Sequence, residues 1–271
     1  MSTFYNSERL KYNQMNYNND VELDNFCSQC LLVINAVGPS FKINDKIALH
    51  ALRNNCHYID IGGYGILRDL LKPYEKSIEA QKLCFIIGVG WMPGISGVFS
   101  KTIIETHLNS PENTNFNIYY GAVDNWSYSS TYDLAASSMG KTRSYVYSHG
   151  KEIQVSPFRY THHKFFPFIG HKKICMPSFD EQLTQLATSL KQIRKISTFI
   201  MLNDYISMGK FMFIKIFYKH NLNKATLMLQ DDYQRLVKKE NKWGSVICQV
   251  SKIEPERKID TFYYLYTKNN F

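Results

Sequence analysis

The stretch that decides the fold runs from Cys30 to Tyr64 and reads CLLVINAVGPSFKINDKIALHALRNNCHYIDIGGY. Two short apolar runs, at 31–36 and 58–61, each lead into a glycine turn, as strands buried on both faces do. Between these runs, apolar residues recur every three or four positions over 43–52, which predicts an amphipathic helix. A strand, a helix and a strand at this length predict one crossover unit of a parallel sheet.

Both glycine turns follow the carboxyl ends of their strands, which is the edge where open α/β sheets bind ligands. A glycine there lets the backbone approach a ribose or a nicotinamide closely, because glycine has no Cβ. Asp60 is expected either to bind the ligand or to cap the turn that follows it. The alternative for the Gly-Pro pair is a plain strand-to-helix turn. The residues that we predict to bind a nucleotide cofactor are Asn35, Ala36, Gly38, Pro39, Tyr58, Asp60 and Gly63.

Three linked motifs, VINAVGP, CHYIDIGG and GVGWMPGISG, follow one another over roughly residues 8–105. In this order they resemble the saccharopine dehydrogenase-like oxidoreductases. The resemblance implies a Rossmann domain that binds NADP or NAD. It also implies reversible hydride transfer between that cofactor and the C–N bond of an amino-acid-derived substrate.

The sequence contains no G-x-G-x-x-G, the turn that holds the pyrophosphate at a helix N-terminus in a complete dinucleotide fold. The start of the gene could be internal, the family member degenerate, or the first half supplied by another polypeptide. We therefore expect this chain alone to bind the cofactor weakly or not at all, and its activity to be impaired. The alternative is a non-catalytic remnant that acts as a binding or dimerisation partner.

The polar stretch NSPENTN at 109–115 predicts a linker. Beyond it, candidate strands and helices alternate irregularly, which predicts an α+β arrangement with a mostly antiparallel sheet. The predicted fold class is therefore α/β. An incomplete Rossmann-like parallel sheet occupies 1–108, and an α+β substrate or dimerisation domain occupies 109–271.

Two segments are candidates for substrate binding. Pro93-Gly94 begins a helix whose N-terminus could meet an anion through free backbone N–H groups, or could simply be a helix start. In the resembled family a hydroxyl-rich segment faces the cleft, which implies that Ser127, Ser130 and Thr131 bind a carboxylate. These three residues could equally serve as loop and helix-cap residues. No catalytic residue is predicted, since hydride transfer depends more on positioning than on a dedicated side chain.

Composition sets the remaining expectations. The net charge of +9 comes without a nucleic-acid motif, and neither a secretory segment nor a membrane span is evident, so we expect a cytoplasmic protein with neither kind of partner. No metal site is expected, because His162, His163 and His171 lack acidic partners at ligand spacing. Expected partners are the nucleotide cofactor, a small amino-acid-like substrate, and a second copy or complementing chain that covers the incomplete sheet.

Overall fold

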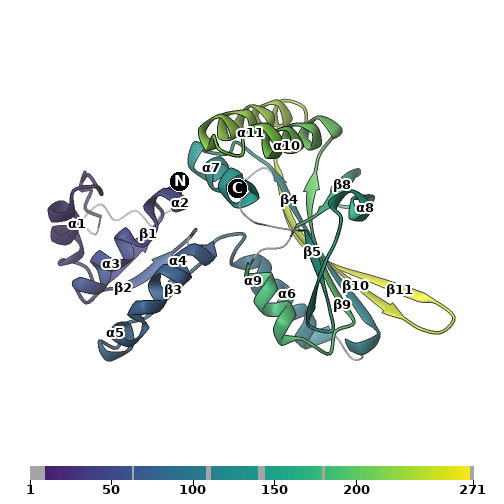
Figure 1. Cartoon of the computed structure of the whole chain (residues 1–271), viewed down its shortest axis with the longest axis horizontal. Helices are drawn as coiled ribbons and strands as arrows, with labels where there is room; N and C mark the ends of the chain where they lie inside the picture. Colours follow the sequence, from purple (N-terminus) through teal and green to yellow (C-terminus); the bar gives the residue numbers. More distant parts are fainter. Residues whose placement is uncertain (1–9, 63, 108–110, 140–143, 179–180, 269–271) are drawn as a thin grey trace. The chain divides into compact units, whose positions relative to one another are not determined.

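The computed structural model describes residues 10–62, 64–107, 111–139, 144–178 and 181–268. Two compact units are present: Met1–Val37 with Ile43–Ile87, and Gly38–Lys42 with Gly88–Phe271 (Figure 1). The predicted domain boundary at residue 108 lies inside the second unit, because helix α6 (Ile95–His107) belongs there.

The first unit is built on a three-stranded parallel sheet of order β1-β2-β3, formed by Leu32–Asn35, His57–Asp60 and Phe85–Ile87. Helix α3 (Lys46–Arg53) connects β1 to β2, and its apolar residues Ile47, Ala48 and Ala51 are buried as the spacing predicts. The short helix α1 (Asp20–Cys27) precedes β1 in the sequence, and α2 (Ser40–Ile43), whose first three residues belong to the second unit, follows it. The predicted crossover unit of a parallel sheet is confirmed.

The connection from β2 to β3 is broken into shorter elements than the sequence predicts. A single helix over 69–82 is the sequence-based expectation. The structure has α4 (Tyr64–Leu71), a 3-10 turn (Lys72–Tyr74) and α5 (Glu75–Ala80). Pro73 explains the break, because it lacks an N–H donor and cannot continue an α-helix through its interior.

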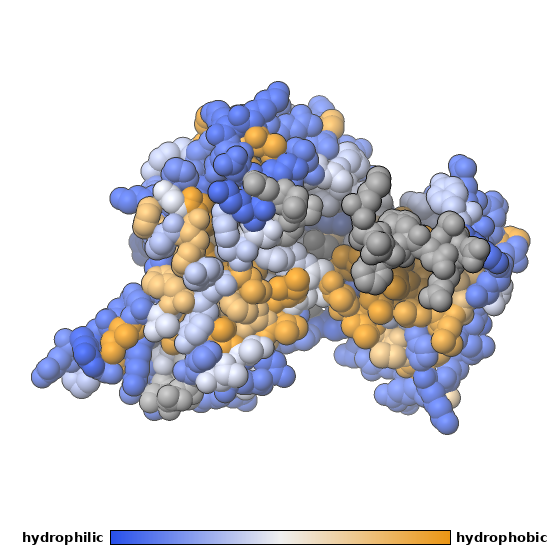
Figure 2. Space-filling model, turned by 180° about the vertical axis from the view of Figure 1, so that it is seen from behind, coloured by the Kyte–Doolittle hydropathy of each residue, from blue (hydrophilic) through white to orange (hydrophobic). Residues whose placement is uncertain are grey.

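The two faces of this small sheet differ in how they are covered. Val33 and Tyr58 point to one face and are buried against residues of α1, α3 and α4. Leu32, Ile34, Ile59 and Ile86 alternate with them, and the strand register places these four on the opposite face. Of these, Leu32, Ile34 and Ile86 are exposed, and Figure 2 shows hydrophobic residues gathered over the surface of this unit, at the right. We call these four residues the open sheet face.

The second unit contains an eight-stranded sheet whose main path has the order β11-β10-β4-β9-β5-β6, with β8 pairing β9 and β7 pairing β8. Among the described pairs, β4 and β9 run parallel and the others antiparallel, so the predicted mostly antiparallel sheet is confirmed. Its strands β4 to β11 are Thr114–Val123, Tyr145–Ser148, Lys151–Gln154, His162–Phe166, His171–Pro177, Lys195–Leu202, Trp243–Ile253 and Lys258–Lys268.

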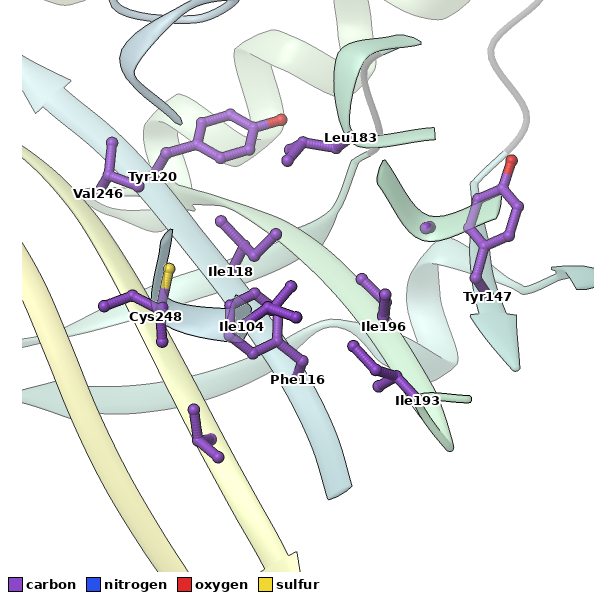
Figure 3. Packing of buried hydrophobic residues seen from close by; sticks show 13 residues of the cluster. Ile104, Phe116, Ile118, Tyr120, Tyr147, Leu183, Ile193, Ile196, Val246 and Cys248 are labelled. Carbon is purple, nitrogen blue, oxygen red and sulfur yellow. The ribbon is translucent and has the colours of Figure 1, made fainter. Parts of the chain in front are cut away.

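Helices pack on both faces of this sheet. On one face α6 and α9 (Glu181–Ser189) bury a core around Phe116, Ile118 and Val246, in which Ile104 and Leu183 contribute the helix side (Figure 3). The other helices of this unit are α7 (Tyr128–Met139), α8 (Pro157–Tyr160), α10 (Tyr205–Phe217) and α11 (Leu222–Val237). None of the helices within the described residues is both long and apolar enough to cross a membrane.

Candidate functional site

The carboxyl ends of β1 and β2 carry a buried polar group of three residues, Asn35, Tyr58 and Asp60, which we call the strand-end cluster. The register pairs Asn35 with Asp60 on neighbouring strands. The Asn35 amide nitrogen donates to the Asp60 carboxylate at 2.7 Å and to the Tyr58 hydroxyl at 3.0 Å. The Tyr58 hydroxyl donates to the same Asp60 oxygen at 2.6 Å. Three of the residues predicted from the sequence are therefore hydrogen-bonded to one another in the structure.

Most of the hydrogen-bonding capacity of the strand-end cluster is used within the chain. Both amide hydrogens of Asn35 are engaged, and its oxygen accepts from the Val37 backbone N–H at 3.0 Å. Burial, followed by the neighbouring Asp60 carboxylate, raises the pKa of Tyr58, so its hydroxyl stays a donor at neutral pH. The cluster thus holds the ends of the two strands in place, and Asp60 has protein partners in Asn35 and Tyr58.

The turn after β1 is shaped by contacts with α7. A Cβ added to Gly38 would lie 2.7 Å from the Ser129 Cβ, closer than such atoms normally approach, and Gly38 is not among the residues with positive φ. Ala36 is exposed, Gly38 is half-buried and Pro39 is buried. The absence of a side chain at Gly38 is therefore required by packing within the protein. Gly63, the last of the predicted cofactor residues, lies outside the described residues.

Asp133 is a residue of this turn that the sequence analysis missed. Its two carboxylate oxygens accept from the backbone N–H groups of Ser40 at 2.9 Å and Phe41 at 3.2 Å, and the residue is 7% exposed. A carboxylate at this position caps the first turn of α2, as an acidic side chain at a helix start does. Local pattern gives no signal for it, because Asp133 is separated from Ser40 by 93 positions.

The Pro93-Gly94 turn offers no free donors to an anion in its first helical turn. The Gly94 N–H donates to the Gln182 side chain at 2.9 Å. The next N–H groups, of Ile95 and Ser96, donate to the carbonyls of Gly90 and Trp91. Gly94 has a φ of +124°, and a Cβ there would overlap the Gly90 carbonyl oxygen. The structure therefore accounts for Gly94 by backbone geometry, and the expected free N–H groups are not found at these positions.

The hydroxyl-rich segment begins helix α7. The Ser127 hydroxyl accepts from the Ser130 N–H at 3.1 Å and lies 3.0 Å from the Ser130 hydroxyl. The Thr131 hydroxyl donates to the Ser127 carbonyl at 2.8 Å. These contacts are those of a helix N-cap and its first turn, which is the alternative that the sequence left open.

A second polar group lies on the large sheet and was not predicted. The Lys164 ammonium and the Tyr119 hydroxyl both donate to the Gln249 side-chain oxygen, at 2.8 and 3.1 Å, and Gln249 donates to Ser251. Burial lowers the pKa of Lys164. Such a chain of bonded side chains on a buried sheet face satisfies its own members and specifies how the strands pair.

Metal-binding groups are not found among the residues that the structure describes. His162 packs edge-on against the rings of Tyr119 and Phe199. The neighbouring His163 instead bonds through its Nε2 to the Tyr205 hydroxyl at 2.9 Å. The two rings thus face different surroundings, as neighbouring residues on a strand do.

Among family models and curated proteins, none matches this chain. Solved structures do: a dehydrogenase (MviM) of Clostridium difficile has a TM-score of 0.36, 8% identity, and coverage of 92% of this chain and 66% of its own. The protein yvaA of Bacillus subtilis, assigned as an oxidoreductase, has a TM-score of 0.34 and 6% identity, and the match covers 92% of this chain and 71% of yvaA. This chain therefore spans about two thirds of the first of these. Both scores are low, so the proposal for function rests on the residues of this chain.

Proposed function

We propose that the chain serves in NAD(P)-dependent hydride transfer at the C–N bond of an amino-acid-derived substrate, with the first unit as part of the nucleotide-binding sheet. The observation that carries this proposal is the edge of the parallel sheet where Asn35 and Asp60 meet at the ends of β1 and β2. Ligands of open parallel sheets bind at this edge. Two of the three motifs that resemble the saccharopine dehydrogenase-like family, VINAVGP and CHYIDIGG, contain Asn35 and Asp60.

The residues present fit the ribose or nicotinamide part of such a cofactor but not its pyrophosphate. The exposed residue Ala36 and the turn that the strand-end cluster holds in place suit close approach by a ribose or a nicotinamide ring. A bound nicotinamide would supply the hydride carrier. No glycine-rich pyrophosphate turn is present in the sequence, and the N–H groups of Gly94, Ile95 and Ser96 at the start of α6 are engaged. Neither a sequence motif nor the described start of α6 therefore offers a cradle for the pyrophosphate.

Cofactor affinity tests this account. Titration with NADPH, followed by its fluorescence, should give a dissociation constant above about 1 mM, equivalent to roughly 4 kcal/mol of binding free energy, because a pyrophosphate cradle is lacking. Competition with adenosine monophosphate controls for non-specific quenching. Micromolar binding that the competitor displaces would show that a phosphate site exists elsewhere on the chain, and the incomplete-site proposal would be wrong.

A second candidate function is a non-catalytic binding or dimerisation partner, and the open sheet face favours it. Parallel sheets are almost always covered on both faces, whereas Leu32, Ile34 and Ile86 remain exposed here. Mixing the chain with a paralogue that carries the glycine-rich turn separates the two functions. Micromolar NADPH binding by the mixture that neither chain shows alone supports a role in hydride transfer. A stable complex whose cofactor affinity equals that of the paralogue supports a non-catalytic partner.

A further inference from the structure

Helix α10 carries an apolar surface on the side that faces away from the protein. Ile206, Gly209, Phe213, Ile216 and Phe217 are spaced three and four residues apart and therefore share one side of the helix. Ile216 and Phe217 are 66% and 65% exposed, and Ile206 and Phe213 are also exposed. A Cβ at Gly209 would meet no atom within 4 Å. We call these five residues the α10 outer face.

The opposite side of α10 is fixed in the core of the second unit. Phe211 and Ile214 are buried in a cluster with Leu202 of β9 and with Ala225 and Leu229 of α11. The side chain of Asp204 caps the helix and bonds to Arg235 of α11. In Figure 1, α10 and α11 lie together at one margin of the second unit. The outer face is thus an apolar surface on a helix that cannot easily rotate to bury it.

Unpaired charges on α10 and on the start of α11 are positive. The segment from Tyr205 to Gln230 contains four lysines and one histidine but no aspartate or glutamate. Lys210 is paired with Asp231 of α11. Lys219 and Lys224 are exposed at the junction of α10 and α11, and no carboxylate of the described residues pairs with either. Leu227, 58% exposed, adds one more apolar residue from α11.

We propose that the α10 outer face binds the surface of an anionic lipid bilayer, with Ile216 and Phe217 entering the interface and Lys219 and Lys224 contacting the headgroups. A helix with an outward apolar side bordered by lysines lies in the plane of the interface. Its 13 residues are fewer than the roughly 20 that span a bilayer, so α10 lies on the membrane and does not cross it. This departs from the sequence-based expectation of no membrane partner, and it does not depend on the proposed oxidoreductase function.

Charge favours a lipid surface over a second copy of the chain. If two α10 outer faces met, two surfaces that both carry unpaired lysines, Lys219 and Lys224, would come together, and net charge of the same sign opposes association. An anionic leaflet instead attracts the same lysines. A bilayer therefore satisfies both the apolar residues and the charges of this surface.

Vesicle flotation of the full chain tests the proposal. The chain should float with vesicles in which one third of the lipid is phosphatidylserine and the rest is phosphatidylcholine. It should remain at the bottom with vesicles of phosphatidylcholine alone. Reversing two charges, Lys219→Glu with Lys224→Glu, should weaken binding by well over tenfold, since each lysine near an anionic surface is worth about fivefold. Ile216→Ser with Phe217→Ser should weaken it at least tenfold. High salt should weaken binding by the wild-type chain.

A matched control removes apolar side chains from another surface of the second unit. Ile153→Ser with Phe158→Ser changes two exposed residues, 47% and 75% exposed, and should leave flotation unchanged. Thermal unfolding of every variant checks that each is folded. Failure of the wild-type chain to float, or equal binding to neutral vesicles, would overturn the proposal. The proposal would also be overturned if the wild-type chain did not bind vesicles and the α10 variants abolished self-association in light scattering, because the face would then be a protein interface.

Discussion

At the scale of the residue, the close packing of Gly38 on Ser129 explains why the turn after β1 carries a glycine. The two Cβ positions would be 2.7 Å apart if Gly38 had a side chain. We expect Gly38→Ala to lower the free energy of unfolding by about 1–3 kcal/mol, the usual cost of overpacking. Urea unfolding measures this change. The effect should come from the clash, because Gly38 has no positive φ that alanine would strain.

A double-mutant cycle separates the clash from other effects of the added methyl group. In a Ser129→Gly background, Gly38→Ala should cost much less, because the atom that it meets is gone. Gly209→Ala serves as a matched control, since a Cβ there meets nothing and alanine favours a helix. If Gly38→Ala cost the same with and without Ser129, the contact with α7 would not be the reason for the glycine.

The sequence could predict which polar residues meet on the small sheet but not what they bond to. Asn35 and Asp60 end neighbouring parallel strands, so their proximity follows from local pattern alone. Asp133 reaches Ser40 across 93 positions of sequence, and Gln182 reaches Gly94 across 88. Such long-range partners depend on how helices pack, which a single sequence does not reveal. They determine that the predicted turn and helix start are satisfied within the chain.

At the scale of the element, an ion pair between α10 and α11 should make stability depend on pH. Burial alone would raise the pKa of Asp204, but hydrogen bonds from Arg235 and Ser207 outweigh it and hold this pKa well below its usual range. Arg235 donates to both Asp204 oxygens, at 2.7 and 2.9 Å. A carboxyl group whose pKa is lowered by folding stabilises the protein above its unfolded pKa, and this stabilisation is lost as pH falls toward the folded value.

Asp204→Asn should therefore destabilise the chain at neutral pH, and the difference from the wild type should shrink as pH falls below about 4. Asparagine still caps a helix, so the variant isolates the charge from the cap. Urea midpoints measured between neutral and acidic pH give the comparison. Glu105→Gln, which removes an exposed pair with Lys101, should change little at any of these pH values. A pH-independent difference for Asp204→Asn would mean that its charge does not matter.

Elements with a strong period were predictable, and those that depend on tertiary contacts were not. The sequence predicts a strand over 195–202, which ends in an apolar run, and a helix over 222–236; the structure has β9 and α11 at these positions. Helix α10 has apolar residues on all sides, which gave no helical period to detect. Helix α7 begins in a run of serines and tyrosines, a composition that is also typical of loops. The structure shows that Ser127 caps this helix.

At the scale of the whole molecule, the α/β class was predictable because it rests on the order of strands and helices along the chain. The boundary between the two compact units depends on contacts that are distant in sequence. By contacts, the second unit begins at Gly88, before the polar stretch at 109–115, and it also includes Gly38–Lys42. Helix α6 belongs to the second unit through packing with α9 and β10, and packing of this kind leaves no mark in local composition.

The open sheet face leads to a prediction about association. β1 bonds to β2 on one side, and no other described strand pairs with it, so the backbone groups of Leu32 and Ile34 point outward along a free edge. A free edge beside exposed apolar side chains favours pairing with another chain. We expect light scattering to give a mass above the 31.6 kDa of one chain, increasing with protein concentration. Ile34→Lys should shift the population toward the monomer, because a charge on this face opposes its burial.

Two comparisons make this result specific. Phe158→Lys, at a more exposed residue of the second unit, should leave the mass unchanged. The pair Ile216→Ser with Phe217→Ser should also leave it unchanged, because the α10 outer face is proposed to bind lipid and not a second copy. A wild-type chain that stays monomeric at high concentration would show that the open sheet face is tolerated in water. Association that survives Ile34→Lys but is lost in the α10 variant would move the interface to the second unit, and would also count against the lipid proposal.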